Sequence, residues 1–89
     1  MTDLTTTIRL NVRLFAAAGA AAGSETAVLE LYPGATVGDA LEKLCGHSEE
    51  LALVLQKCSY LCDGIAVRDR STVLQDHQTL DVLPPFAGG

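Results

Sequence analysis

The run IRLNVRLF at residues 8–15 alternates apolar and polar side chains with a period of two, which predicts a half-buried β-strand. One face is apolar and the other polar, with Ile8, Leu10, Val12 and Leu14 opposite Arg9, Asn11 and Arg13. Phe15 breaks the alternation, because its position assigns it to the polar face. Such a strand must bury its apolar face, so the rest of the chain has to supply a cover.

The main helix is predicted in the segment TVGDALEKL. Thr36 is its expected N-cap, and Asp39 three residues later completes a pattern similar to a capping box. An apolar stripe at helical spacing follows, formed by Val37, Ala40, Leu41 and Leu44. We expect this helix to end around Gly46 and to cover the strand.

A second strand and two short helical segments are also predicted. The second strand is predicted over TAVLELY, where Pro33-Gly34 ends it and one face carries Ala27, Leu29 and Leu31. Before it, the alanine-rich run AAAGAAAGSE predicts a short helical turn with Gly19 and Gly23 as stops. After the main helix, Ser48 is expected to cap another helical segment whose inward positions are Leu51, Val54 and Leu55.

The last third of the chain predicts short strands. Asp63-Gly64 is its strongest hairpin signal, with short apolar runs on both sides. The final strand lies in LDVLPPF, with Leu80 and Val82 facing the core and Asp81 and Leu83 facing out. The predicted fold class is therefore α+β, a mixed sheet of four to five strands with one main helix packed on one face. We expect a single domain over residues 1–89 and an extended tail over residues 84–89.

Charge and composition exclude several classes of function. The formal net charge is −5, which argues against a nucleic-acid-binding protein because phosphate binding needs a basic patch. An acidic surface favours a basic partner or serves solubility alone, and both interpretations stay open. The opening MTDLTTTIRL does not resemble a signal peptide, and FAAAGAAAG is too short to span a bilayer. We therefore expect a cytoplasmic protein that has no contact with a membrane.

No catalytic set is apparent among the side chains. His47 and His77 each lie beside turn-forming residues, and no Ser, His and Asp can be assigned catalytic roles. The odd number of cysteines does not suit a disulfide framework, and no familiar zinc spacing joins Cys45, Cys58 and Cys62. We expect reduced thiols, no metal site, and Cys62 in the core. Four charged residues are expected to be solvated at the surface: Asp69, Arg70, Asp76 and Asp81.

The segment LPPFAGG offers the chemistry that the side chains lack. A terminal carboxylate is a poor acyl donor, but an acyl-adenylate of Gly89 would be reactive. Glycine has no Cβ, so Gly88 and Gly89 could enter the narrow site of an enzyme that activates the carboxylate. Pro84 and Pro85 stiffen the base of this arm and hold it extended.

This segment resembles the end of the ubiquitin-like sulfur carriers, most of all the MoaD family, the small subunits of molybdopterin synthase. The resemblance covers nearly the whole chain and includes the first strand ending in LFA, the PGATVGDALEKL helix entry, the CDG turn and PP-x-x-GG. It implies a β-grasp fold and no bound cofactor beyond the modified terminal glycine. Two departures are Cys62-Asp63, where the family often has Asn, and Phe86, where a smaller aliphatic residue is common.

The resemblance also implies partners and roles. An E1-like (MoeB-like) enzyme would adenylate Gly89, a sulfur donor would convert it to a thiocarboxylate, and Gly88 would permit entry into the partner's site. The large synthase subunit (MoaE-like) would then place the sulfur on cyclic pyranopterin monophosphate. Independently, Phe15 and Leu83 end two strands expected to lie side by side and parallel, which predicts an apolar docking patch. With it, the expected partner-binding residues are Phe15, Leu83, Pro84, Pro85, Phe86 and Ala87.

Three alternatives stay open. A carrier for thiamin thiazole or cysteine synthesis would use the same tail chemistry, although the double proline favours the molybdopterin pathway. A ubiquitin-like modifier would instead form isopeptide bonds to lysines. A plain binding module would be unaffected by deletion of Gly88-Gly89.

Overall fold

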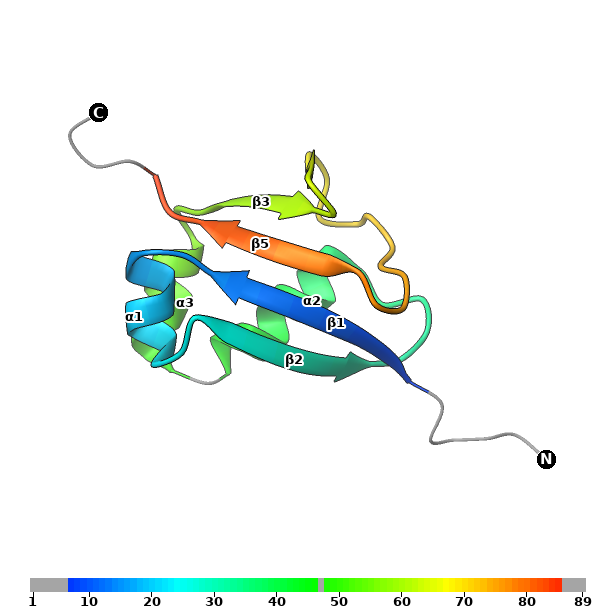
Figure 1. The fold of residues 1–89 in the computed structure, drawn as a ribbon, viewed down its shortest axis with the longest axis horizontal. Helices are drawn as coiled ribbons and strands as arrows, with labels where there is room; N and C mark the ends of the chain where they lie inside the picture. Colours follow the sequence, from blue (N-terminus) through cyan, green and yellow to red (C-terminus); the bar gives the residue numbers. More distant parts are fainter. Residues whose placement is uncertain (1–6, 47, 86–89) are drawn as a thin grey trace.

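The computed structural model describes residues 7–46 and 48–85. It contains three helices and five strands within these ranges (Figure 1). Along the chain they are β1 (Ile8–Leu14), α1 (Ala17–Ala22), β2 (Thr26–Leu31), α2 (Val37–Cys45), α3 (Glu49–Leu55), β3 (Ser59–Cys62), β4 (Ile65–Ala66) and β5 (Thr79–Leu83). The α+β prediction is confirmed, and two shorter helices accompany the main helix, α2.

The strands form one mixed sheet in the order β2-β1-β5-β3-β4 (Figure 1). Neighbouring strands are antiparallel except for the central pair, β1 and β5, which run parallel with Leu14 beside Val82. Because β1 and β5 run in the same direction, both end at the same edge of the sheet. The chain leaves the sheet there through Pro84 and Pro85.

The core lies between one face of the sheet and the helices. It is built from small and medium aliphatic side chains with a single aromatic: Ile8, Leu10, Val12, Leu14, Ala18, Leu29, Leu31, Val37, Ala40, Leu41, Leu44, Leu51, Leu55, Tyr60, Leu74, Leu80 and Val82. The alternation predicted for β1 is confirmed, since its four apolar residues are buried. Leu74 was not foreseen as a core residue, because it lies in an irregular segment and gives no periodic signal.

Local signals explain the helices. The capping box of α2 is present, with the Thr36 Oγ1 accepting from the Asp39 N–H and the Asp39 carboxylate accepting from the Thr36 N–H. The Ser48 Oγ accepts from the Leu51 N–H at the start of α3, also as predicted.

The Asp63-Gly64 turn has positive φ at both residues and joins β3 to β4 in the predicted hairpin.

Two predictions about small residues need correction. Gly19 does not stop α1 but lies inside it, and only Gly23, at φ 78°, ends the helix in the left-handed conformation. A Cβ at Gly19 would lie 2.7 Å from the Leu14 carbonyl oxygen, so the glycine permits α1 to approach β1 closely. Cys62, which was predicted in the core, is half-buried at its margin, whereas Val54, which was predicted to face inward, does pack against the core and is also half-buried.

Candidate functional site at the end of the central strands

The candidate site is built where β1 and β5 end. The Phe15 N–H donates to the Val82 carbonyl oxygen at 3.1 Å, which extends the parallel pairing one residue beyond β1. This register brings Phe15 beside Leu83, so the two residues predicted as neighbours do lie at the same corner of the sheet. On the other side, Leu83 pairs with Ser59 of β3.

The two apolar side chains differ in exposure. Phe15 exposes 40% of its surface, whereas Leu83 is half-buried. Phe15 is followed by Ala16, whose φ of 49° and ψ of −124° are unfavourable for a residue with a Cβ. This sharp turn sends the chain from the sheet directly into α1, so Phe15 stays on the outer face while α1 continues around the end.

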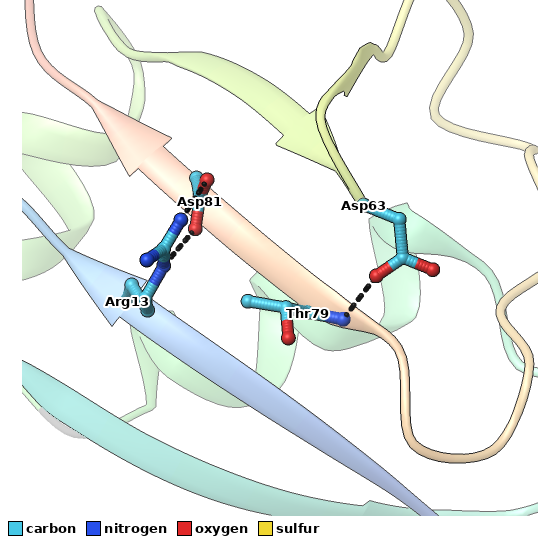
Figure 2. A network of polar contacts seen from close by, with 4 residues as sticks. All are labelled: Arg13, Asp63, Thr79 and Asp81. Atoms are coloured by element: carbon cyan, nitrogen blue, oxygen red, sulfur yellow. Dashed lines mark hydrogen bonds and ion pairs between the residues drawn. The ribbon is translucent and has the colours of Figure 1, made fainter.

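An ion pair supports the outer face next to Phe15. The Arg13 guanidinium donates to both carboxylate oxygens of Asp81, from Nε at 2.6 Å and from Nη2 at 2.8 Å (Figure 2). The side-chain hydrogen bond to Asp81, with the carboxylate's charge, raises the pKa of Arg13 above its ordinary value. The guanidinium carbon also lies 5.5 Å from the centre of the Phe15 ring, within cation–π range.

Asp81 had been expected at the solvated surface, and this expectation is wrong. It points to the outer face as predicted, yet only 6% of its surface is exposed because Arg13 and the neighbouring strands cover it. The sequence held a signal for this pair. Arg13 and Asp81 occupy outward positions of two strands expected to be adjacent, so their opposite charges could have been matched.

A second carboxylate fixes the start of β5. Asp63, in the hairpin turn, accepts a hydrogen bond from the Thr79 N–H at 2.9 Å (Figure 2) and another from the Gln78 side-chain amide at 3.2 Å. The acid thus performs a structural task at the position where the resemblance led us to expect Asn. Asp81 and Asp63 together hold β5 at its middle and at its beginning.

The base of the predicted tail follows β5 directly. Pro84 is half-buried and Pro85 is exposed, and both line a groove of about 270 Å³ together with residues of α1 and α3 and Lys57. Phe86, Ala87, Gly88 and Gly89 lie outside the described residues, as does His47. A larger hollow of about 620 Å³ lies at the opposite end of β1, near Thr7 and Tyr32, away from this site.

The cysteines and charged residues elsewhere supply no further chemistry at this corner. Cys45, Cys58 and Cys62 are half-buried free thiols, and burial raises the pKa of both Cys58 and Cys62. A raised pKa disfavours the thiolate, the form that attacks electrophiles and binds metals. Among residues 7–46 and 48–85, no three His, Cys, Asp or Glu side chains gather closely enough to hold a metal ion.

None of the helices described in the structure has the length and apolar character needed to cross a membrane.

Comparison with known proteins identifies the family. The sequence profile of the ThiS family matches residues 12–89 of this chain. A search of the curated proteins finds no match.

Three solved structures illustrate the likeness. SAMP1 from Haloferax volcanii is 29% identical, with a TM-score of 0.81 over 91% of this chain and 99% of its own. A putative molybdopterin converting factor, subunit 1, from Pyrococcus furiosus is 23% identical, with a TM-score of 0.80 over 89% of this chain and 99% of its own. The complex of subunits 1 and 2 of the molybdopterin-converting factor from Helicobacter pylori contains a chain that is 21% identical, with a TM-score of 0.67 over 92% of this chain and 100% of its own. The latter two likenesses concern the fold, and they agree with the predicted ubiquitin-like β-grasp.

Proposed function

We propose that this chain carries sulfur on Gly89 as the small subunit of molybdopterin synthase. The chain belongs to the ThiS family of ubiquitin-like sulfur carriers. One observation carries this proposal. The central strand β5 runs directly into Pro84-Pro85, and the residues that follow are Phe86, Ala87 and the diglycine. A rigid sheet that leads into a proline-stiffened segment suits a domain whose chemistry takes place inside another protein.

The proposed chemistry has two steps. An E1-like adenylating enzyme joins the Gly89 carboxylate to the α-phosphate of ATP and releases pyrophosphate. Hydrosulfide, or its equivalent on a sulfur donor, then attacks the acyl carbon and displaces AMP, which leaves a thiocarboxylate. The reaction needs no side chain of this domain, in keeping with the raised thiol pKa values of Cys58 and Cys62.

The thiocarboxylate then serves the large synthase subunit, a partner like subunit 2 of the Helicobacter pylori complex. That subunit transfers the sulfur to cyclic pyranopterin monophosphate. The carrier itself binds no metal or organic cofactor in this proposal. We assign the reaction to the cytoplasm, where reduced thiols such as the three cysteines of this chain persist.

The 29% identity to SAMP1, a small archaeal modifier protein, favours a second candidate function, conjugation of Gly89 to lysines. Carriers for thiamin thiazole or cysteine synthesis share the activation step and differ in the acceptor. Pro84-Pro85 favours the molybdopterin pathway over the thiamin pathway, because the thiamin carriers tend to lack the double proline.

Reconstitution tests the pathway. The chain is converted to its thiocarboxylate, mixed with the large subunit and cyclic pyranopterin monophosphate, and compared with a variant that lacks Gly89. We expect sulfur to leave the full chain and to appear in the pterin product, with no product from the truncated variant. Isopeptide adducts on lysines, without any pterin product, would instead identify a modifier.

A further inference from the structure

The groove at the base of the tail lies on the helix side of the sheet, opposite the Phe15 corner. It is lined by Ala17 of α1, by two residues of α3, by Lys57 and by both prolines, which together give Ala17, Leu53, Val54, Lys57, Pro84 and Pro85. Helices α1 and α3 lie side by side at the end of the molecule where the chain leaves the sheet (Figure 1). We call these six residues the proline groove.

Leu53 has no role in the fold that would explain it. The inward positions of α3 are Leu51 and Leu55, which are 1% and 3% exposed, whereas Leu53 exposes 62% of its surface. A large aliphatic side chain on the outer face of a short helix gains nothing from the core. Single exposed apolar residues are common, but this one lines a groove together with Ala17, Val54 and both prolines.

Lys57 adds a charge to this apolar groove. Two other cations of the chain are engaged, since Arg13 pairs with Asp81 and Lys43 donates to the Glu30 carbonyl oxygen. Lys57 forms no ion pair within residues 7–46 and 48–85, as is also true of Arg9, Arg68 and Arg70, but Lys57 alone of these four lines this groove. In a chain with a net charge of −5, an ammonium that pairs with no carboxylate of the described residues and lies beside an apolar hollow is complementary to an apolar side chain flanked by a carboxylate.

The position of the groove limits what can occupy it. Three residues lie between Pro85 and Gly89, and the four residues that follow Pro85 span at most about 14 Å even when fully extended. An enzyme that encloses the Gly89 carboxylate therefore brings its own surface within about 14 Å of the groove. Adenylation is the step shared by every sulfur-carrier and modifier pathway considered above, whereas the acceptors differ between them.

We propose that the proline groove is a docking site for the E1-like adenylating enzyme, which inserts an apolar side chain against Leu53 and sets a carboxylate beside Lys57. The inference rests on the proposed function, since its occupant is the enzyme that activates Gly89. Together with the Phe15 corner on the opposite face, the groove lets the enzyme hold the sheet from both sides of the departing chain.

Steady-state adenylation of the full chain tests the proposal. The variants are Leu53→Glu, Leu53→Gln, Lys57→Glu and Lys57→Arg, with Ile65→Glu as the matched control. Ile65 is 73% exposed in β4, at the end of β3 remote from Leu83, and its replacement also exchanges an exposed aliphatic side chain for a carboxylate. The urea midpoint of each variant is measured alongside, because replacement of an exposed side chain should leave the fold intact.

We expect the KM for the carrier to rise about tenfold for Leu53→Glu, and several-fold for Lys57→Glu, with kcat nearly unchanged. Lys57→Arg should retain the wild-type KM, Leu53→Gln should show an intermediate increase, and Ile65→Glu should behave as wild type. Equal KM values for all variants would overturn the inference while leaving the proposed function standing. The inference would also be overturned if the wild-type chain forms a dimer that Leu53→Glu abolishes without a change in KM. The groove would then bind a second copy of this chain. A wild-type chain that is never adenylated would refute the proposed function and the inference with it.

Discussion

Arg13 and Asp81 form an ion pair across the central strands, on the outer face of the sheet. The carboxylate is buried and both its oxygens accept from one guanidinium, whose own side chain is 56% exposed. Replacement of Arg13 by Met leaves the buried Asp81 carboxylate without its partner, and we therefore expect the free energy of unfolding to fall. Urea denaturation measures this loss.

The matched control removes both charges. The double variant Arg13→Met with Asp81→Leu should recover most of the stability, because no buried carboxylate is then left unpaired. A double variant as unstable as Arg13→Met alone would show that the unpaired Asp81 carboxylate is not the cause of the lost stability.

Tyr60 predicts how stability depends on pH in the alkaline range. Its hydroxyl donates to the Leu55 carbonyl oxygen, and burial, followed by the negative charge of the Cys58 thiolate, raises its pKa to about 12, although the nearby Arg70 acts in the opposite direction. The folded chain therefore holds this proton more tightly than the unfolded chain, whose tyrosine titrates near an ordinary value of about 10. The resulting stabilisation is complete below about pH 10 and is lost as the pH rises through about 12.

Urea midpoints between pH 8 and pH 12 check this expectation. Tyr60→Phe should lose about 0.5–1.5 kcal/mol near neutral pH, where the hydrogen bond is removed, and should depend less on pH above 10 than the wild type does. The burial-raised thiol pKa values of Cys58 and Cys62 act in the same direction and persist in this variant. Parallel curves for Tyr60→Phe and wild type would contradict the assignment.

At the scale of elements, Gly19 sets how closely α1 packs on β1. Alanine is the better helix former by about 1 kcal/mol, so helix propensity alone predicts that Gly19→Ala stabilises the protein. The new Cβ would lie 2.7 Å from the Leu14 carbonyl oxygen, a backbone atom that cannot move without shifting β1. We expect the clash to dominate, with a net loss of about 1–2 kcal/mol in the free energy of unfolding.

Thermal unfolding of Gly19→Ala measures the balance of these two effects. Ala20→Gly serves as the control in the same helix, because Ala20 is exposed and its replacement should cost only the propensity difference. A Gly19→Ala variant more stable than wild type would mean that α1 moves away from β1 at little cost.

The ends of β1 and β5 form the predicted docking patch. Phe15→Asp and Leu83→Asp should each weaken binding to the large subunit or to the adenylating enzyme about tenfold, because an apolar contact at the outer corner is replaced by a desolvated charge. Isothermal titration checks the affinity, and far-UV circular dichroism checks that the domain stays folded. Unchanged affinity in both variants would show that Phe15 and Leu83 do not form a docking patch.

At the scale of the whole molecule, the fold followed from local signals that agreed with one another. The alternation in β1, the Thr36 capping box and the Asp63-Gly64 turn each predicted the element that the structure contains. Together with the resemblance, they led to the parallel β1–β5 pair, which brings Phe15 beside Leu83.

What the sequence did not reveal depended on close tertiary approach. Gly19 was predicted to end the helix, because the Leu14 carbonyl oxygen that leaves no room for a Cβ there belongs to another element, β1. Asp81 read as a solvated charge, because its burial depends on Arg13 from a strand 68 residues away. The sequence did not predict that Leu53 and Lys57 line a groove, since only the packing of α3 beside Pro84 brings them together.

The most direct test of the central claim is the intact mass of the chain after incubation with the E1-like enzyme, ATP and hydrosulfide. The account predicts a gain of about 16 Da, the replacement of one oxygen by sulfur, in the full chain and no gain in a variant that lacks Gly89. An unchanged mass in the full chain, with the enzyme shown to be active on another carrier, would contradict the assignment of sulfur transfer to this protein.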